Sequence, residues 1–235
     1  MTKKFPNLVR YQEYQYANIF LIQKLLDFPK KLDKYFEIVK KNILEKKKIK
    51  NEDNAKINEK IYDYVMCKIY DKIFPNEAYE NDMKIFHSTI KLSWTEPKHF
   101  IKSKRELVFG TFLKDVSKLF KLMDSEKSPR KKILNLKEIY NSIEILLKSN
   151  GVRNAGVDDH LTILSYSIVK SSELRLYSNA EFMKLYIGEK KFKLEEILII
   201  QLLSACKFIA NLKYQDLIDV SYDEFNTKCN EMLQK

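Results

Sequence analysis

The sequence predicts an all-α protein, and three observations lead to this fold class. Its 235 residues include only four glycines and five prolines, which leaves little material for the many tight turns of a β-sandwich or barrel. Leu, Ile, Lys and Glu recur in long blocks, and most of these residues are good helix formers. Apolar residues also repeat at three- and four-residue spacing, as expected for helices with one buried face. With 45% apolar residues, the chain can build one sizeable core, or one core with a smaller appendage.

The first part of the chain predicts two helices within residues 8–45, separated near Pro29. The following segment, EKKKIKNEDNAKINEK, runs from Glu45 to Lys60 and has only three apolar residues, so it predicts a solvated linker or a helix extension. Its lysines at 46–48 could contact acidic lipid, but a solvated basic surface is the commoner role of such a short cluster.

A continuous series of helical patterns begins at residue 61. The pattern predicts a helix over 61–74 that stops at Pro75, and another over 78–94 that is closed by the turn at residues 95–97. Residues 98–123 predict one or two helices. A further helix is expected to begin at Ser128-Pro129 and to run to residue 149, because Ser is a good N-cap and Pro is well tolerated at the first helical position.

The segment from Gly151 to Leu176 places two adjacent carboxylates at the start of a strongly apolar helix. Asp158 and Asp159 follow a loop that carries two of the four glycines, so they are expected at the junction of a turn and a helix N-terminus. Apolar residues cover most of the circumference of the helix that follows, which predicts an element packed on several sides. Either acid could simply cap the helix, and that is the more common role of an Asp in this position. The alternative role is a rigidly aimed carboxylate.

Three more helices are predicted beyond this segment. They cover residues 179–187, 193–212 and 222–234, and the first of them is expected to be capped by Ser178 or Asn179.

The charge and the cysteines narrow the class of partner. The net charge of +11 and the isoelectric point near 9.3 come almost wholly from lysine. Nucleic-acid readers favour arginine for bidentate contacts, so specific nucleic-acid recognition is a weak hypothesis here. A general attraction to anionic surfaces, including acidic membrane or an acidic partner, fits the composition better. The three cysteines are widely separated and predict reduced thiols in a cytosolic protein.

Several kinds of catalytic site have no counterpart in the sequence. It contains no glycine-rich phosphate loop, no nucleophile with an adjacent base and no metal-ligand cluster, so we expect neither a cofactor nor a metal. The most apolar run, residues 197–212, is interrupted by Gln201 and Lys207 and is too short to span a bilayer, so a soluble chain is expected. What remains is a helical domain with one preorganised acid beside an apolar helix surface, which suits binding to another protein.

A series of local motifs resembles a known family in both order and spacing. They are Tyr64-Val65-Met66 with Ile69-Tyr70 and Phe74, Asp82, Leu92 with residues 94–97, residues 127–133, residues 156–161, residues 176–179, Phe208-Ile209, and Leu217 with residues 221–225. Together they resemble the catalytic domain of the vacuolar protein sorting nine (VPS-nine) guanine nucleotide exchange factors, the Rabex and Rin group that acts on endosomal Rab GTPases. The segment around Asp158 is the most diagnostic of these motifs.

The resemblance implies an all-α exchange domain over residues 56–235, preceded by a reduced N-terminal helical bundle over residues 1–55. It implies that Asp158 is the catalytic acid pushed into the nucleotide site of a Rab of the early endosome. The contacts with the GTPase would come from the two helices that flank this acid, namely from Asp159, Leu161, Thr162, Ser165, Ile197 and Ile200. The chain would act as a monomer in the cytoplasm, peripherally associated with endosomes and with possible contact to acidic membrane.

Two departures from the family pattern concern the predicted contacts. Thr162 stands where the family has proline, four residues after the catalytic acid. A Tyr-x-x-Thr pair of the family falls at Ile197 and Ile200 when counted back from Phe208-Ile209. A count forward from Gly188-Glu189 gives Phe192 and Glu195 instead, and neither count restores the pair. These departures leave open a second hypothesis, a non-catalytic Rab-binding module. A basic nucleic-acid binder is a third hypothesis, and only the charge favours it.

Overall fold

The computed structural model describes residues 54–75, 78–101, 107–152, 154–187 and 193–234, together with five positions between residues 31 and 41. Within these residues all regular elements are helices, which confirms the predicted all-α class. They are α2 (Asn54–Ile73), α3 (Tyr79–Lys91), α4 (Pro97–Phe100), α5 (Phe112–Ser125), α6 (Pro129–Ser149), α7 (Val157–Ser171), α8 (Leu176–Tyr186), α9 (Lys193–Asn211), the short 3₁₀ helix η3 (Tyr214–Asp216) and α10 (Tyr222–Leu233).

The chain divides into two compact units, Met1–Tyr62 and Asp63–Lys235, and the division falls inside α2. In the first unit, the described positions between residues 31 and 41 are helical, and the ring of Phe36 contacts that of Tyr62 with 4.8 Å between centroids. The helix α2 begins at Asn54, so it extends into the segment that was predicted as a linker or a helix extension. The first predicted helix and the lysines at 46–48 lie outside the described residues. The domain boundary at residues 55 and 56 stays a prediction.

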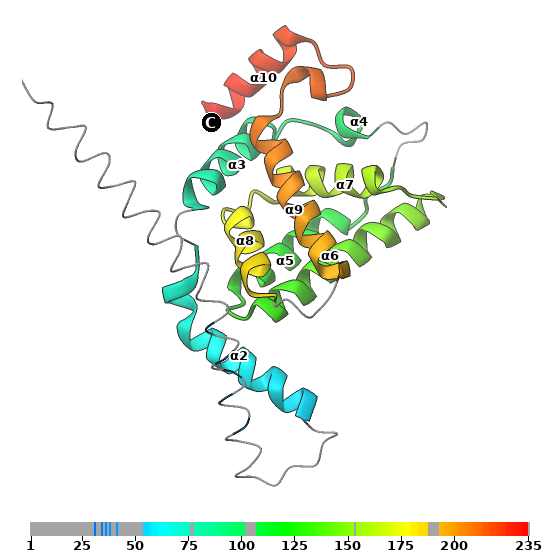
Figure 1. The fold of residues 1–235 in the computed structure, drawn as a ribbon. Helices are drawn as coiled ribbons and strands as arrows, with labels where there is room; N and C mark the ends of the chain where they lie inside the picture. Colours follow the sequence, from blue (N-terminus) through cyan, green and yellow to red (C-terminus); the bar gives the residue numbers. More distant parts are fainter. Residues whose placement is uncertain are drawn as a thin grey trace, which may run out of the picture. The chain divides into compact units, whose positions relative to one another are not determined.

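The second unit is built around α9. This helix packs against α7, α8, α3 and α6, while the pair α5–α6 packs on α7 and α8 (Figure 1). Helix pairs of this kind bury apolar side chains from both partners. The resulting core draws on every one of these helices, and its most deeply buried members include Phe120, Leu136, Ile143, Leu164, Ile168, Met183, Leu202 and Ile209.

The helix α7 is enclosed on all sides in its middle part. Seven consecutive residues, 163–169, are buried, so this helix has no solvent-facing side over about two turns. The sequence prediction of a helix packed on several sides is therefore confirmed. Only the first turn of α7 reaches the surface freely.

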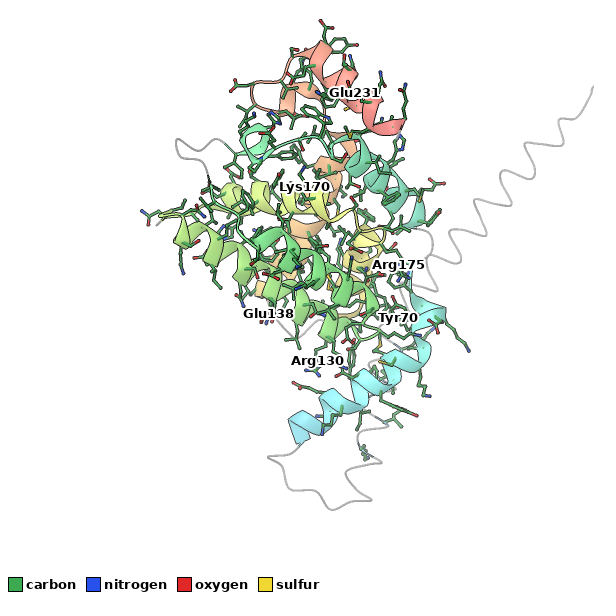
Figure 2. All side chains as sticks on the ribbon, turned by 180° about the vertical axis from the view of Figure 1, so that it is seen from behind. Tyr70, Arg130, Glu138, Lys170, Arg175 and Glu231 are labelled. Carbon is green, nitrogen blue, oxygen red and sulfur yellow. The ribbon has the colours of Figure 1, made fainter. Side chains whose placement is uncertain are left out.

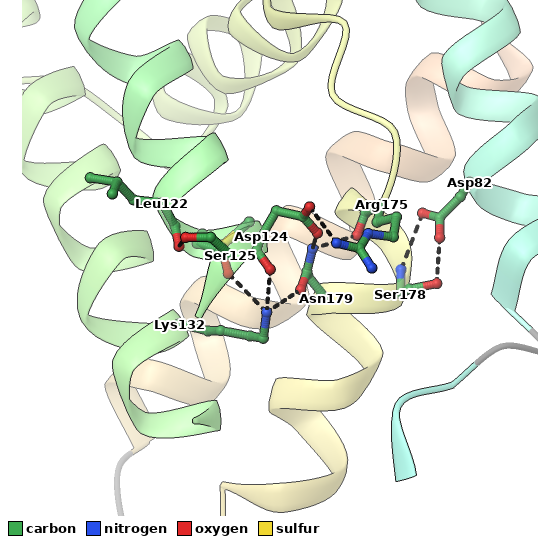
Figure 3. A network of polar contacts seen from close by, with 9 residues as sticks. Asp82, Leu122, Asp124, Ser125, Lys132, Arg175, Ser178 and Asn179 are labelled. Carbon is green, nitrogen blue, oxygen red and sulfur yellow. Dashed lines mark hydrogen bonds and ion pairs between the residues drawn. The ribbon is translucent and has the colours of Figure 1, made fainter. Parts of the chain in front are cut away.

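A buried lysine ties α6 to its neighbours. The ammonium of Lys132 donates to the carbonyls of Met123 and Asp124 at 2.8 and 3.1 Å, and to Oδ1 of Asn179 at 2.7 Å (Figure 3). Burial lowers the pKa of Lys132 to about 8, because the charged form loses its hydration. Asn179 in turn donates to Asp124 at 2.8 Å, and Arg175 pairs with the same carboxylate at 2.6 Å. One polar network thus joins α5, α6 and the start of α8.

The part of α2 that follows Asp63 is held on this network by rings and charges. Tyr70 contacts Phe182 edge-on, with 5.2 Å between ring centroids, and its ring lies 5.2 Å from the Lys132 ammonium. Asp63 accepts from Ser128 and pairs with Arg130, and both contacts lower the pKa of Asp63 against the opposing effect of burial. Figure 2 shows Tyr70 on α2 and Arg130 next to this helix, at the start of α6. Ser128 is the N-cap residue of α6, as predicted, but its hydroxyl binds Asp63 instead of the first turn.

The start of α8 corrects one prediction. The helix begins at Leu176, so Ser178 and Asn179 lie within its first turn and do not cap it. The cap comes from α3, where Oδ1 of the buried Asp82 accepts from the backbone N–H groups of Tyr177 and Ser178 at 2.8 and 3.2 Å (Figure 3). Its other oxygen accepts from the Ser178 hydroxyl. A local pattern does not reveal a carboxylate that is supplied from about 95 residues away.

Replacing Asp82 with alanine leaves two N–H groups of α8 without their acceptor in a buried place. We expect Asp82→Ala to lower the free energy of unfolding by about 2 to 4 kcal/mol. Asp82→Asn is the control, because its amide keeps one oxygen acceptor, and it should cost less. Urea unfolding followed by circular dichroism measures both variants. Equal stability of Asp82→Ala and the parent chain would contradict this role.

Candidate functional site

The two adjacent acids at the start of α7 have different roles. Asp159 caps the helix, because its Oδ2 accepts from the backbone N–H of Gly156 at 2.8 Å. Asp158 is exposed and makes no hydrogen bond or ion pair with the described residues. The sequence left open which acid caps, and the structure resolves this: Asp159 holds the turn, and Asp158 is presented to solvent. Val157, just before it, is 63% exposed.

The imidazole of His160 fixes the same turn to α6. Its Nδ1 lies 2.8 Å from the carbonyl oxygen of Gly156, and its Nε2 lies 2.8 Å from a carboxylate oxygen of Glu144. The pKa of Glu144 is lowered mainly by its hydrogen bond with Lys148 and, to a smaller extent, by its contact with His160. The turn that carries Asp158 is therefore held by its own cap and by a bridge to a neighbouring helix.

A stripe of apolar side chains lies along the solvent-facing side of α9. Ile197 and Ile200 are 50% and 48% exposed, and Leu194 and Phe208 continue the stripe toward the two ends of the helix. Ser204, also exposed, lies between them. The opposite side of α9 is in the core, so the helix is apolar on both sides. A surface of this kind is typical of contact with another protein.

Contacts to α6 place this stripe near Asp158. At the start of α9, Glu195 pairs with Lys137, and the Leu198 carbonyl accepts from the Tyr140 hydroxyl at 3.4 Å. At the start of α7, His160 contacts Glu144, which lies four residues beyond Tyr140. Four residues are about 6 Å along a helix axis. The turn with Asp158 and the turn with Ile197 and Ile200 are thus neighbours along α6.

The other predicted contact residues fall into two groups. Leu161 and Thr162 are partly buried in the first turns of α7 and keep some exposed surface. Ser165 is only 1% exposed, so the prediction that it contacts a partner disagrees with the structure. It lies within the segment of α7 that is enclosed on all sides. For the alternative count, Glu195 is buried and paired with Lys137, while Phe192 and Gly188-Glu189 lie outside the described residues.

Sequence reasoning missed three features of this surface. Neither the bridge from His160 to Glu144 nor the exposure of Leu194 and Phe208 was predicted. The spacing of Leu194, Ile197, Ser204 and Phe208 is helical, but the other side of α9 is equally apolar, so the pattern does not reveal which side faces solvent. The bridge joins residues on different helices, and no local pattern indicates it.

The described part of the chain contains neither a metal-binding cluster nor a membrane-spanning helix. No group of three His, Cys, Asp or Glu side chains there is arranged to hold a metal ion. None of the described helices is both long and apolar enough to cross a bilayer.

These features define a class of protein: a small all-helical domain that presents one acidic side chain beside an apolar helix surface. The family model of the vacuolar sorting protein 9 (VPS9) domain matches residues 113–214. Residues 113–214 thus match a VPS9 domain, which confirms the resemblance drawn from the motifs. The matched range contains α7, α8 and α9, and hence Asp158 and the apolar stripe.

Curated relatives agree with this assignment. The chain is 26% identical over 191 residues to the Rab5 GDP/GTP exchange factor of Homo sapiens, a match that covers 76% of this chain and 38% of the relative. It is 24% identical over 204 residues to the proteins of the same name from Bos taurus and Mus musculus, covering 82% of this chain and 40% of each relative. The chain thus spans about two fifths of the length of the curated relatives it matches.

Because the two acids have different roles, replacing each of them should change the free energy of unfolding by a different amount. We expect Asp159→Ala to lower the free energy of unfolding by about 1 kcal/mol, since it deletes a helix cap. Asp158→Asn should change it by less than about 0.5 kcal/mol, because an exposed side chain without a partner is replaced. Thermal and urea unfolding of both variants test the assignment. A cost for Asp158→Asn equal to that of Asp159→Ala would show that both acids support the fold.

Proposed function

We propose that this chain is a guanine nucleotide exchange factor for a Rab-family GTPase of the early endosome. Asp158 acts as the acid that enters the nucleotide site, and the exposed surface of α9 binds the GTPase. The observation that carries the proposal is the exposed Asp158 on a turn fixed by Asp159 and His160, within a VPS9 domain. The relatives named as Rab5 GDP/GTP exchange factors support the choice of partner.

The chemistry requires only a fixed negative charge. A small GTPase holds its nucleotide mainly through a P-loop lysine and Mg²⁺ on the phosphates. A carboxylate brought into that site attracts the lysine and disfavours the metal, so bound nucleotide loses stabilisation. Nucleotide bound at nanomolar to picomolar Kd is held by roughly 12 to 16 kcal/mol. Removing about 4 kcal/mol from the dissociation barrier would speed release roughly a thousandfold.

The apolar stripe supports a protein partner with an apolar contact surface. Ile197 and Ile200 occupy the places of the family's Tyr-x-x-Thr pair and offer methyl groups where the family offers polar atoms. The chain's excess of lysine adds a general attraction to acidic membrane. We place the protein in the cytoplasm with peripheral contact to endosomes.

Asp158→Ala tests the role of the acid. The variant should lose most of its acceleration of nucleotide release, on the order of a hundredfold or more, because no other acid takes its place. Release of labelled GDP from Rab5 and from a panel of Rab proteins measures the effect. Binding to nucleotide-free Rab should weaken, because the contact of Asp158 with the P-loop lysine is lost, while the contacts of the stripe remain. If the variant releases GDP as fast as the parent chain, the role assigned to Asp158 is wrong.

A pair of charged substitutions tests the stripe. We expect Ile197→Asp with Ile200→Asp to weaken Rab binding at least about tenfold, since both side chains would be buried against the partner. Leu122→Asp is the matched control, because Leu122 on α5 is 52% exposed. Its neighbour Lys121 pairs with Glu173, which follows the C-terminal end of α7. Asp158 is at the N-terminal end of α7, so the control lies at the other end of that helix. Equal binding by the double variant and by the control would argue against this surface.

A second candidate is a non-catalytic Rab-binding module. Thr162 in place of the family's proline, and the isoleucines on α9, favour it because they remove features of the family's contact surface. Stable Rab binding without faster nucleotide release would support this candidate over exchange.

A further inference from the structure

His160 joins the site of Asp158 to α6 through both of its ring nitrogens. Nδ1 lies 2.8 Å from the Gly156 carbonyl oxygen, and Nε2 lies 2.8 Å from Oε2 of Glu144. Gly156 precedes the first turn of α7, and its N–H is held by Asp159. The peptide groups that set the direction of Asp158 thus depend on the position of this imidazole.

Both contacts of His160 face groups that only accept hydrogen bonds. A backbone carbonyl oxygen has no proton to donate. Glu144 is a carboxylate, because Lys148 at 3.0 Å and His160 both stabilise its ionised form and lower its pKa. Both ring nitrogens thus face acceptors, and only the imidazolium form of histidine can donate to both.

The neutral imidazole cannot keep this bridge. It has one N–H, so one nitrogen would present a lone pair to an oxygen lone pair at hydrogen-bond distance. Either the Gly156 carbonyl or the Glu144 carboxylate then loses its partner. The charged groups that face His160 among the described residues are Glu144 and Lys148 from α6, and the neighbouring carboxylates Asp158 and Asp159 from α7.

We propose that His160 is a positioning residue for Asp158 and makes the exchange reaction sensitive to pH. The imidazolium bridges α6 to the start of α7 and holds Asp158 in place. Loss of its proton releases one of the two contacts and loosens the turn. The inference rests on the exchange function proposed above.

The test is the pH profile of nucleotide release, expressed at each pH relative to the intrinsic release of the Rab alone. For the unchanged chain, the acceleration should be roughly fivefold higher at the acidic end of the profile than at the basic end, because loss of the His160 proton removes one contact of the bridge. His160→Gln should give a lower and flat profile, since the glutamine does not titrate. An unchanged profile in His160→Gln would overturn the proposal.

Glu144→Gln distinguishes the bridge from a merely structural contact. A glutamine at this position can donate its amide N–H to a neutral imidazole or accept from an imidazolium. Both protonation states of His160 then keep two contacts, so activity should be retained and the profile should become flat. A Glu144→Gln profile as steep as that of the unchanged chain would overturn the proposal.

The other two histidines provide controls. His87 is exposed on α3, so His87→Gln should leave the profile unchanged. His99 is buried, and its Nδ1 accepts from the backbone N–H of Glu96 at 3.0 Å. Burial lowers the pKa of His99, and its protonation would remove that contact, so its effect on stability appears on acidification. That is opposite in direction to the effect of His160.

Nitrogen NMR of His160 and amide hydrogen exchange of residues 156–159 supply a readout that needs no exchange activity. We expect both ring nitrogens to carry protons at the acidic end of the profile, and amide exchange to quicken beyond its ordinary pH dependence when His160 loses its proton. A neutral His160 at that pH would overturn the bridge. If the bridge behaves as expected but no Rab responds at any pH, the positioning role stands for the turn and the exchange function is wrong.

Discussion

The enclosure of α7 is the constraint on which the rest of the structure depends. Seven consecutive buried residues leave this helix no solvent-facing side, so it cannot slide or rotate without opening the core. Its first turn is the only part that reaches solvent freely. Because the core holds this turn rigidly, the carboxylate of Asp158 can point in a fixed direction without a partner of its own.

Polar groups within the domain keep the helices around α7 in register. Lys132 is buried with three oxygen acceptors, and Asp82 is buried with three donors from the start of α8. Each group is expensive to bury alone, and each is satisfied only when α3, α5, α6 and α8 are assembled in one arrangement. These networks therefore favour a single packing of helices whose apolar contacts alone would tolerate small shifts. The relative positions of α6, α7 and α9, and with them the site, follow from that packing.

The sequence predicted the helices well because their signals are local. Apolar spacing and the proline stops placed α3, α6, α7, α9 and α10 within a few residues, and the adjacent acids marked the start of α7. The cap of α8 was misplaced, because its acceptor is Asp82 on another helix. The resemblance predicted Ser165 as a contact residue, whereas helical geometry turns it into the core. The exposed side of α9 could not be chosen from local spacing, because apolar residues occur on both sides of the helix.

Under the proposed function, Asp158 and the apolar stripe contribute to different parts of the exchange reaction. Exchange requires that the domain binds the nucleotide-free GTPase more strongly than the nucleotide-bound one, since equal binding of both states lowers no barrier. The apolar contacts of Ile197 and Ile200 do not depend on the nucleotide, so they contribute affinity for both states. Asp158 meets a free lysine in one state, and phosphates with Mg²⁺ in the other, so its contribution changes sign between them. The affinity of this surface and its ability to release nucleotide are thus carried by different residues, and the rigidity of the α7 turn concerns only the second.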